Sequence, residues 1–296
     1  PRAGPVTQSE QRFSRREENS MRKTWLITGC SSGLGSHIAA TAAARGDRIV
    51  ATARDPAVLQ PLARQFPENL RAVQLDVTDP VSVAAALAFA EREFGGLDVL
   101  VNNAGIGFIG AVEEAEPSEY RPVFEVNVFG LIETTRLALP VLRRRGGGRI
   151  VNLSSGAGLS GGPGSGYYSA SKFAVEGFSE SLAREVAPFG IRVTIVEPGP
   201  FRTDFLGRSI AMANQVIPAY ADTAGRRRAY RDSNDGKQAG DPRKAAAVIV
   251  QAVMATEPPL HLPLGPVAYD IAERKSQALR ADMAAWRDLA LHTDFD

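Results

Sequence analysis

Short apolar runs that alternate with longer amphipathic segments constrain this chain's fold more than any other feature. Strands that alternate with helices indicate a parallel sheet, whose right-handed crossovers place helices on both faces. The pattern therefore predicts the α/β class, with a doubly wound, mostly parallel sheet of about seven strands. The predicted strands are 25–28, 48–53, 70–75, 97–101, 150–153, 191–196 and, more weakly, 259–264, and the main predicted helices are 34–45, 80–94, 116–143 and 168–187.

The 296 residues are predicted to form a single domain over 21–296. Residues 1–20 are polar and Met21 opens the first patterned segment, so we expect 1–20 to be an appended or disordered leader. An irregular polar stretch over 204–240 interrupts the alternation. Long insertions of this kind are lids or disordered excursions, and we expect a substrate lid. Apolar residues at helical spacing within 268–290 predict core packing or a subunit contact; they are Leu279, Met283, Trp286 and Leu289.

The composition excludes several classes of partner. A formal net charge of +1 gives no sign of nucleic acid or an anionic membrane as a partner. The basic runs 143–145 and 226–228 are interpreted as solvated surface, with a patch that binds phosphate groups as the alternative. No apolar run reaches the ~18 residues of a membrane span, and the first twenty residues lack the apolar core of a signal peptide.

Cysteine and histidine usage points to a reducing compartment without a metal centre. Cys30 is the single cysteine, so no intrachain disulfide can form and a cytoplasmic protein is expected. The three histidines show no metal-ligand spacing and are interpreted as surface or packing residues; they are His37, His261 and His292.

A glycine-rich turn lies between the first predicted strand and the first predicted helix. Glycines there let the backbone turn sharply and approach a pyrophosphate, which then lies on the helix N-terminus. Its spacing departs from Gly-x-Gly-x-x-Gly, and a plain tight turn is the alternative, although the position after the first strand favours a dinucleotide site. The turn comprises Thr28, Gly29, Cys30, Ser31, Ser32, Gly33, Leu34 and Gly35.

Arg54 and Asp55 follow the second predicted strand, where the choice between nicotinamide cofactors is normally made. An acid there hydrogen-bonds the adenosine ribose, whereas an arginine accommodates a 2′-phosphate. Asp55-Pro56 is a favourable helix start, so we expect Asp55 to cap a helix and Arg54 to face the ribose. This predicts that NADP(H) is preferred over NAD(H).

Tyr168 and Lys172 are four residues apart near the start of a predicted helix, so their side chains share one face. An ammonium beside a phenol favours the phenolate, which is the adjustment that acid–base catalysis needs. Ser155 follows the fifth strand, where its hydroxyl can hydrogen-bond a reacting carbonyl oxygen; Ser154 is expected to point away. Asn127 lies within a predicted helix. It is either a satisfied polar group or a proton-relay residue that holds a water near Lys172.

These residues together resemble the short-chain dehydrogenase/reductases, in their compact single-domain branch with a Rossmann-type sheet. The resemblance runs from about residue 21 to 203, and each motif typical of the family is intact. It implies a catalytic tetrad of Asn127, Ser155, Tyr168 and Lys172, with Lys172 and Tyr168 also at the cofactor, and a homodimer or homotetramer through helices 116–143 and 168–187. Other residues that it places at the cofactor are Asp76 and Val77, then Asn103, Ala104 and Gly105 after Asn102, and Pro198, Gly199 and Thr203.

The resemblance implies an oxidoreductase that transfers a hydride between nicotinamide and a carbonyl or alcohol. A non-catalytic NADP-binding regulator or scaffold is the alternative, against which the intact tetrad argues. A sugar-nucleotide epimerase would need a larger substrate domain and another glycine spacing. Apolar residues predict a pocket for a fairly hydrophobic ketone or aldehyde; they are Phe108, Ile109, Phe205, Leu206 and Met212.

Overall fold

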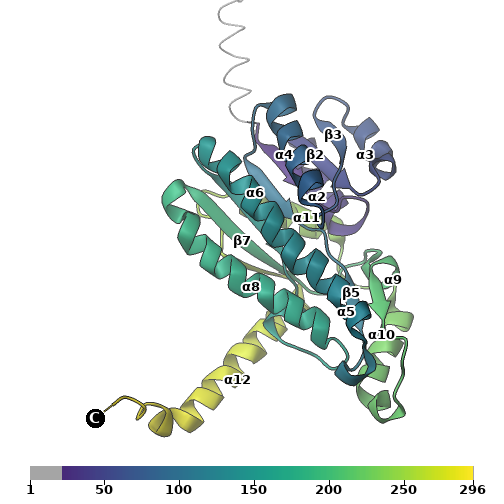
Figure 1. The fold of residues 1–296 in the computed structure, drawn as a ribbon, viewed down its shortest axis with the longest axis vertical. Coiled ribbons are helices and arrows are strands. Elements are labelled where there is room, and N and C mark those ends of the chain that lie inside the picture. Colours follow the sequence, from purple (N-terminus) through teal and green to yellow (C-terminus); the bar gives the residue numbers. More distant parts are fainter. Residues whose placement is uncertain (1–21, 296) are drawn as a thin grey trace, which may run out of the picture.

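The computed structural model describes residues 22–295, so the expectation of a leader over 1–20 lies outside the described residues. These residues form one seven-stranded sheet in which every neighbouring pair is parallel, in the order β3-β2-β1-β4-β6-β7-β9. Helices cover both faces (Figure 1). The predicted doubly wound fold is confirmed.

Each predicted strand is present, with small shifts at its ends. The weak seventh strand is real and pairs with β7 at the sheet edge. The strands are β1 (Thr24–Ile27), β2 (Arg48–Ala53), β3 (Leu70–Gln74), β4 (Val99–Asn102), β6 (Gly148–Leu153), β7 (Ile191–Pro198) and β9 (His261–Leu264), and a separate two-stranded parallel sheet joins β5 (Gly107–Ile109) to β8 (Ile210–Met212).

Alternate residues along the strands build two apolar layers. In β1, Trp25 and Ile27 belong to one buried cluster and Leu26 to the other, because successive side chains point to opposite faces. The first layer packs under α2 (Gly33–Ala44), α3 (Gln60–Gln65) and α11 (Pro242–Met254), and the second under α4 (Pro80–Phe94), α6 (Gly130–Arg144) and α8 (Gly166–Val186).

Aspartate-proline pairs fix where several helices begin. The Asp79 carboxylate accepts from the Val81 N–H at the start of α4, and Asp241 does the same for Arg243 at the start of α11. Each acid caps a free N–H, and the following proline fits the first helical position. The helix over 80–94 is confirmed, whereas α11 is an element that the sequence analysis did not identify.

The predicted helix over 116–143 is interrupted. It consists of α5 (Pro117–Phe124), a π-helical turn η3 (Glu125–Phe129) and α6, and the turn contains Asn127. A π-turn shifts the side-chain register within a helix and is frequent at functional sites.

The stretch over 204–240 is folded and lies beside the carboxyl ends of the strands. It contains α9 (Phe205–Arg208), β8, the short turns η5 (Pro218–Tyr220) and η6 (Ala221–Gly225), and α10 (Arg226–Asn234). In β8, Ile210 and Met212 pair with Gly107 and Ile109, which anchors this segment to the main body. We refer to residues 204–240 as the lid segment, although its action as a substrate lid stays a prediction.

The last helix, α12 (Pro266–Ala290), projects away from the sheet (Figure 1). Ala268 is its one buried residue. The four apolar residues predicted to form a stripe along this helix are exposed by 54–71%; they are Leu279, Met283, Trp286 and Leu289. The prediction that they belong to the core is therefore wrong for the described chain, and a subunit contact stays a prediction. Within residues 22–295, no helix combines the length and the apolar character needed to cross a membrane.

Candidate active site

A cavity of about 1120 Å³ lies where the carboxyl ends of the strands meet the lid segment. In doubly wound sheets, ligands bind outside the carboxyl ends, where the strand order reverses. The cavity extends from Arg54, after β2, to Tyr168 on α8 and Arg227 on α10. Most of the residues predicted at the cofactor line it; they are Gly29, Ser31, Ser32, Gly33, Leu34, Arg54, Asp76, Val77, Asn103, Ala104, Gly105, Tyr168, Lys172, Pro198, Gly199 and Thr203.

The turn after β1 has the geometry of an anion cradle. Gly29 and Gly33 have φ of +70° and +64°, a conformation that residues with a Cβ rarely adopt. No side chain caps the start of α2, and the first residues of this helix, Gly33 and Leu34, line the cavity. The first N–H groups of a helix have no acceptor within the helix, so they are available to a ligand there. These features suit the pyrophosphate of a dinucleotide.

Thr28 and Gly35 do not line the cavity but shape it through the chain after β4. The Thr28 hydroxyl accepts from the N–H groups of Asn103 and Ala104 at 2.9 and 3.0 Å, and Asn103 Nδ2 donates to the Thr28 and Gly29 carbonyls. A Cβ on Gly35 would lie 2.3 Å from Asn103 Nδ2. A side chain at position 35 would therefore displace the amide that holds the turn.

At the opposite end of the cavity, the two residues after β2 have separate roles. Asp55 Oδ1 accepts from the Ala57 N–H at 2.9 Å and caps a 3-10 turn, as predicted. Arg54 is exposed and lies close enough to Asp76 to lower the pKa of that carboxyl, although the main cause is a hydrogen bond from the Thr78 N–H. Arg54 is thus the cation available at this end of the cavity.

Tyr168 and Lys172 lie on one face of α8, as predicted. Lys172 Nζ is 5.8 Å from the centre of the Tyr168 ring and donates to the Leu153 carbonyl at 2.7 Å. Burial lowers the pKa of Lys172 to about 8, while the Glu176 carboxylate, one turn further along, raises it. Burial raises the pKa of Tyr168, and a hydrogen bond with Ser155 opposes this.

Ser155 caps the short helix α7 (Gly156–Leu159) at the end of β6. Its hydroxyl accepts from the Ala157 N–H at 3.1 Å and borders the cavity beside Tyr168. Ser154 faces towards Glu176, where its hydroxyl offsets part of the effect of burial on that carboxyl. Both serines border the cavity, but the Ser154 hydroxyl lies towards Glu176, whereas the Ser155 hydroxyl lies beside Tyr168.

Hydrogen bonds within the protein hold the Asn127 amide in place. Its Oδ1 accepts from the Ile106 N–H at 2.8 Å, and its Nδ2 donates to the Ile106 carbonyl and to Ser171 Oγ. These bonds fix the segment after Gly105 against α8. An amide oxygen can accept two hydrogen bonds, so Oδ1 can still accept one from a water, and a proton-relay role for Asn127 stays a prediction.

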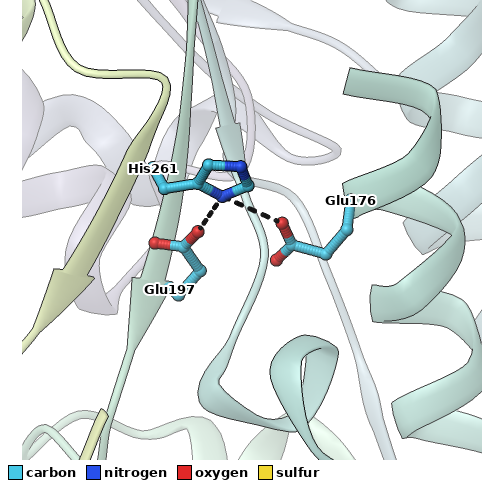
Figure 2. Close-up of side chains that lie close together, drawn as sticks. All are labelled: Glu176, Glu197 and His261. Atoms are coloured by element: carbon cyan, nitrogen blue, oxygen red, sulfur yellow. Dashed lines mark hydrogen bonds and ion pairs between the residues drawn. The ribbon is translucent and has the colours of Figure 1, made fainter. Parts of the chain in front are cut away.

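Behind the active site, His261 of β9 lies between Glu176 of α8 and Glu197 of β7 (Figure 2). His261 Nδ1 is 2.9 Å from Glu197 Oε1 and 3.7 Å from Glu176 Oε2. Burial raises the pKa of Glu197 to about 7 and also raises that of Glu176. The sequence spacing did not indicate this cluster, whose ligand-type atoms lie within 4.8 Å of one another. We interpret it as a hydrogen-bonded cluster in which burial favours the neutral form of the two carboxyls.

The three arginines over 226–228 do not share one environment, so their interpretation as a solvated run is wrong. Arg226 is at the surface and pairs with Asp222, which is 90% exposed. Arg228 makes a buried ion pair with Glu114, a residue that the sequence analysis did not identify. Arg227 lines the cavity.

The predicted apolar pocket is only partly correct. Phe205 and Leu206 line the cavity, and the Phe205 ring centre is 5.8 Å from that of Tyr168. Phe108 and Ile109 are instead buried in packing, and Met212 is not among the lining residues. Apolar residues from other elements complete the wall; they include Ile106, Pro122, Val126, Val267 and Ile271.

Arg208 is a further residue that the sequence analysis missed. It lies on α9, and its Nη2 donates to Ser32 Oγ at 3.1 Å, which joins the lid segment to the glycine turn. The two residues are 176 positions apart, so only the folded chain brings them together.

Comparisons with known proteins agree with this geometry. A family model described as short chain dehydrogenase matches residues 23–214. Oxidoreductase BOA17 of Botryotinia fuckeliana is 39% identical over 272 residues, covering 92% of this chain and 99% of the relative. A 3-ketodihydrosphingosine reductase of Bacteroides thetaiotaomicron is 38% identical, covering 82% and 87%. A crystal structure of a short-chain dehydrogenase from Streptomyces avermitilis is 43% identical with a TM-score of 0.86, covering 93% and 100%.

Proposed function

Because this chain belongs to the short-chain dehydrogenase/reductase family, we propose that it uses NADP(H) to interconvert a fairly hydrophobic ketone or aldehyde and its alcohol. Membership of the family makes the chain a nicotinamide-dependent oxidoreductase of carbonyl or alcohol groups. One observation carries the proposal. Tyr168, Ser155 and Lys172 meet in the same cavity that begins at the glycine turn. A dinucleotide held by that turn can therefore reach the proton-transfer groups.

Each of the three side chains has one task in this reaction. Tyr168 gives a proton to the carbonyl oxygen during reduction, or takes it from the alcohol during oxidation. Ser155 donates a hydrogen bond to the same oxygen as negative charge develops on it. The Lys172 ammonium favours the Tyr168 phenolate and is fixed by the Leu153 carbonyl. A nicotinamide bound in this cavity would supply the hydride for reduction or accept it in oxidation.

The preference for NADP(H) rests on Arg54. Its guanidinium borders the cavity near Asp76, while Asp55 is engaged in capping and does not compete for a ribose. An arginine there offers donors to a 2′-phosphate, and a hydrogen bond to a charged group contributes about 1.5–3 kcal/mol. The phosphate-bearing cofactor should therefore bind more tightly.

Arg54→Leu tests this assignment. We expect the Kd for NADPH, measured by fluorescence titration, to rise about 10- to 100-fold, while the Kd for NADH changes little. Arg64→Leu on α3 is the matched control, because Arg64 is exposed but does not line the cavity. Equal Kd values of the unmodified enzyme for the two cofactors would contradict the preference.

The proposed substrate is hydrophobic because Phe205, Leu206 and Ile271 line the cavity around Tyr168. The relative named as a 3-ketodihydrosphingosine reductase supports a ketone as the reacting group. A panel of ketones and aldehydes with increasing apolar area, followed by NADPH absorbance, tests the proposal. We expect kcat/KM to rise with apolar area, and no turnover across the panel would reject a carbonyl substrate.

We also propose a homodimer or homotetramer that pairs through the helices over 116–143 and 168–187, in the cytoplasm. Phe129 and Phe173 support this interface, because both are large apolar side chains exposed on neighbouring elements, by 55% and 42%. Light scattering on the unmodified protein and on a Phe173→Asp variant tests it. A monomer at all concentrations would contradict the interface.

A further inference from the structure

Four arginines of α10 differ in what balances their charge. Arg226 pairs with Asp222, Arg228 with Glu114 and Arg231 with Asp232. Within residues 22–295, Arg227 forms no ion pair, and its Nε is buried with no hydrogen-bond partner. Its one ring contact is with Tyr230, one turn along the helix, at 5.4 Å from the ring centre.

An unpaired guanidinium at a cavity wall is an unusual arrangement. Buried polar groups are normally hydrogen-bonded, and an unsatisfied one destabilises the folded protein, more so when it is charged. Arginine presents donors in a planar fork that matches a carboxylate. A ligand that carries an anionic group would therefore complete the bonding of Arg227.

Arg227 is close to the reacting end of the cavity. It shares the cavity wall with Tyr168, and its positive charge lowers the pKa of that tyrosine. A Cβ built on Gly164, in the glycine-rich chain that leads to Tyr168, would lie 3.1 Å from Arg227 Cβ. The two segments are thus in contact beside Tyr168.

The helix that carries Arg227 is held firmly. The Glu114 carboxylate pairs with Arg228 and also accepts from the Ile217 N–H. Arg231 Nε donates to the Leu206 carbonyl at 3.0 Å. Because these contacts already order the backbone of the helix, a ligand that binds Arg227 needs to order only its side chain.

Among the residues that the structure describes, no carboxylate forms an ion pair with Arg227. The carboxylates that line the cavity are Asp55 and Asp76, and both lie at its other end, after β2 and β3. The glycine turn and Arg54 already account for the phosphates of a dinucleotide. The remaining anion is therefore one carried by the substrate.

We propose that Arg227 forms an anion subsite, so that the substrate is a carbonyl compound that carries a carboxylate as well as an apolar body. The proposal rests on the proposed function, since it concerns the same cavity. The carbonyl lies at Tyr168 and Ser155, the apolar body contacts Phe205 and Leu206, and the carboxylate pairs with Arg227.

The test compares an aryl keto acid with its methyl ester, which has the same carbonyl but no charge. NADPH consumption gives kcat/KM for both compounds, and calorimetry gives the Kd of the acid with NADP⁺ present. The variants are Arg227→Met, which keeps the length of the side chain, Arg227→Lys, which keeps the charge without the fork, and Arg226→Met, which alters the exposed neighbour. Keto acids of increasing chain length locate the carboxylate.

We expect the unmodified enzyme to prefer the acid, and Arg227→Met to lower kcat/KM for the acid about 10- to 100-fold more than for the ester, whose own smaller loss reports the effect of the Arg227 charge on Tyr168. Arg227→Lys should lie between, and Arg226→Met should match the unmodified enzyme. Equal losses for acid and ester, a change confined to the KM for NADPH, or a Kd of the acid that is insensitive to Arg227 would overturn the subsite. Binding of the acid that depends on Arg227, without turnover of either compound, would support the subsite and reject the proposed reaction.

Discussion

The two halves of the cavity are built by different means. The half at the glycine turn is shaped by backbone and small side chains, and the three closest approaches to a Cβ on Gly35 are all 3.0 Å or less. The half under the lid segment is held by charged side chains, above all the buried pair of Glu114 and Arg228. An added Cβ on Gly29 would lie 2.8 Å from Ala104, and one on Gly35 would lie 2.3 Å from Asn103, so the shape of the first half depends on these glycines. The second half depends instead on charge pairs, so a change in a few charged residues would alter it.

The largest expected effect comes from Tyr168→Phe, which removes one hydroxyl where the two halves meet. Turnover should fall about 10²- to 10⁴-fold, the usual contribution of a general acid or base. The Kd for NADPH should change little, because the glycine turn stays intact. Steady-state assays and a fluorescence titration measure both quantities. Undiminished carbonyl reduction would reject the mechanism, and an unmodified protein that binds NADPH without any turnover would favour a regulator or scaffold.

Glu114→Gln should loosen the lid segment and leave the glycine turn unchanged. Breaking a buried ion pair from one side costs about 3–5 kcal/mol, and Glu114 also accepts from the N–H groups of Ala111 and Ile217. We expect amide exchange over 204–240 to accelerate at least ~100-fold and the substrate KM to rise, with an unchanged Kd for NADPH.

Glu113→Gln is the matched control for that experiment. Glu113 is the neighbouring residue, is exposed, and accepts from the Tyr220 hydroxyl at 2.7 Å. Its loss should alter exchange by much less, since exposed polar pairs contribute about 0–1 kcal/mol. Equal effects of the two substitutions would show that the buried pair does not hold the lid segment.

Gly35→Ala should distort the glycine turn and leave the lid segment unchanged. The added Cβ would lie 2.3 Å from Asn103 Nδ2 and 2.7 Å from the Gly29 carbonyl, so the turn must shift, at a cost of about 1–3 kcal/mol. Thermal unfolding should show a lower Tm, and the Kd for NADPH should rise. Gly177→Ala on α8 is the control, because no heavy atom lies within 4 Å of its Cβ, and alanine should stabilise that helix by up to ~1 kcal/mol. A normal Kd in Gly35→Ala would contradict the close-packed turn.

The smallest expected effect is a shift in pH dependence. Lys172 has a pKa of about 8, lowered by burial, so its ammonium is lost as the pH rises through 8 and kcat/KM should then decline. The Glu176 carboxylate favours the ammonium, so Glu176→Gln should move this decline to lower pH. Glu180→Gln, one turn further along α8 and half-exposed, should leave it in place. A pH profile that is identical in all three proteins would show that Lys172 does not govern the basic limb.

Local sequence patterns were sufficient to predict most strands of the sheet and the position of the glycine turn. The strand over 48–53 and the helix over 80–94 have the predicted bounds, because apolar periodicity and an aspartate-proline start are contained within one segment. The helix of α11 and the π-turn at Asn127 were missed. The Asn127 amide is held in place by Ile106 and Ser171, and these partners are remote in sequence.

The apolar stripe of α12 shows the limit of periodicity. Spacing alone indicates that Leu279, Met283, Trp286 and Leu289 share one face of a helix, and they do belong to one helix. Spacing does not indicate what that face contacts, and in the described chain it is exposed. The same limit applies to Phe108, whose apolar character suited a pocket wall but which packs against Tyr167 instead.

The sequence by itself determined the parallel sheet, the glycine turn after its first strand, and the placing of Ser155, Tyr168 and Lys172 around one site. These features follow from short-range rules, because strand periodicity, helix spacing and glycine conformations depend on neighbouring residues. Only the tertiary structure decided which partners the arginines over 226–228 contact and which of them lines the cavity. Arg228 is largely covered, with 14% of its side chain exposed, and pairs with Glu114 of a distant segment. Arg227 lines the cavity because the lid segment is folded over the strand ends. Charge partners of this kind come from distant parts of the chain, and no local pattern specifies them.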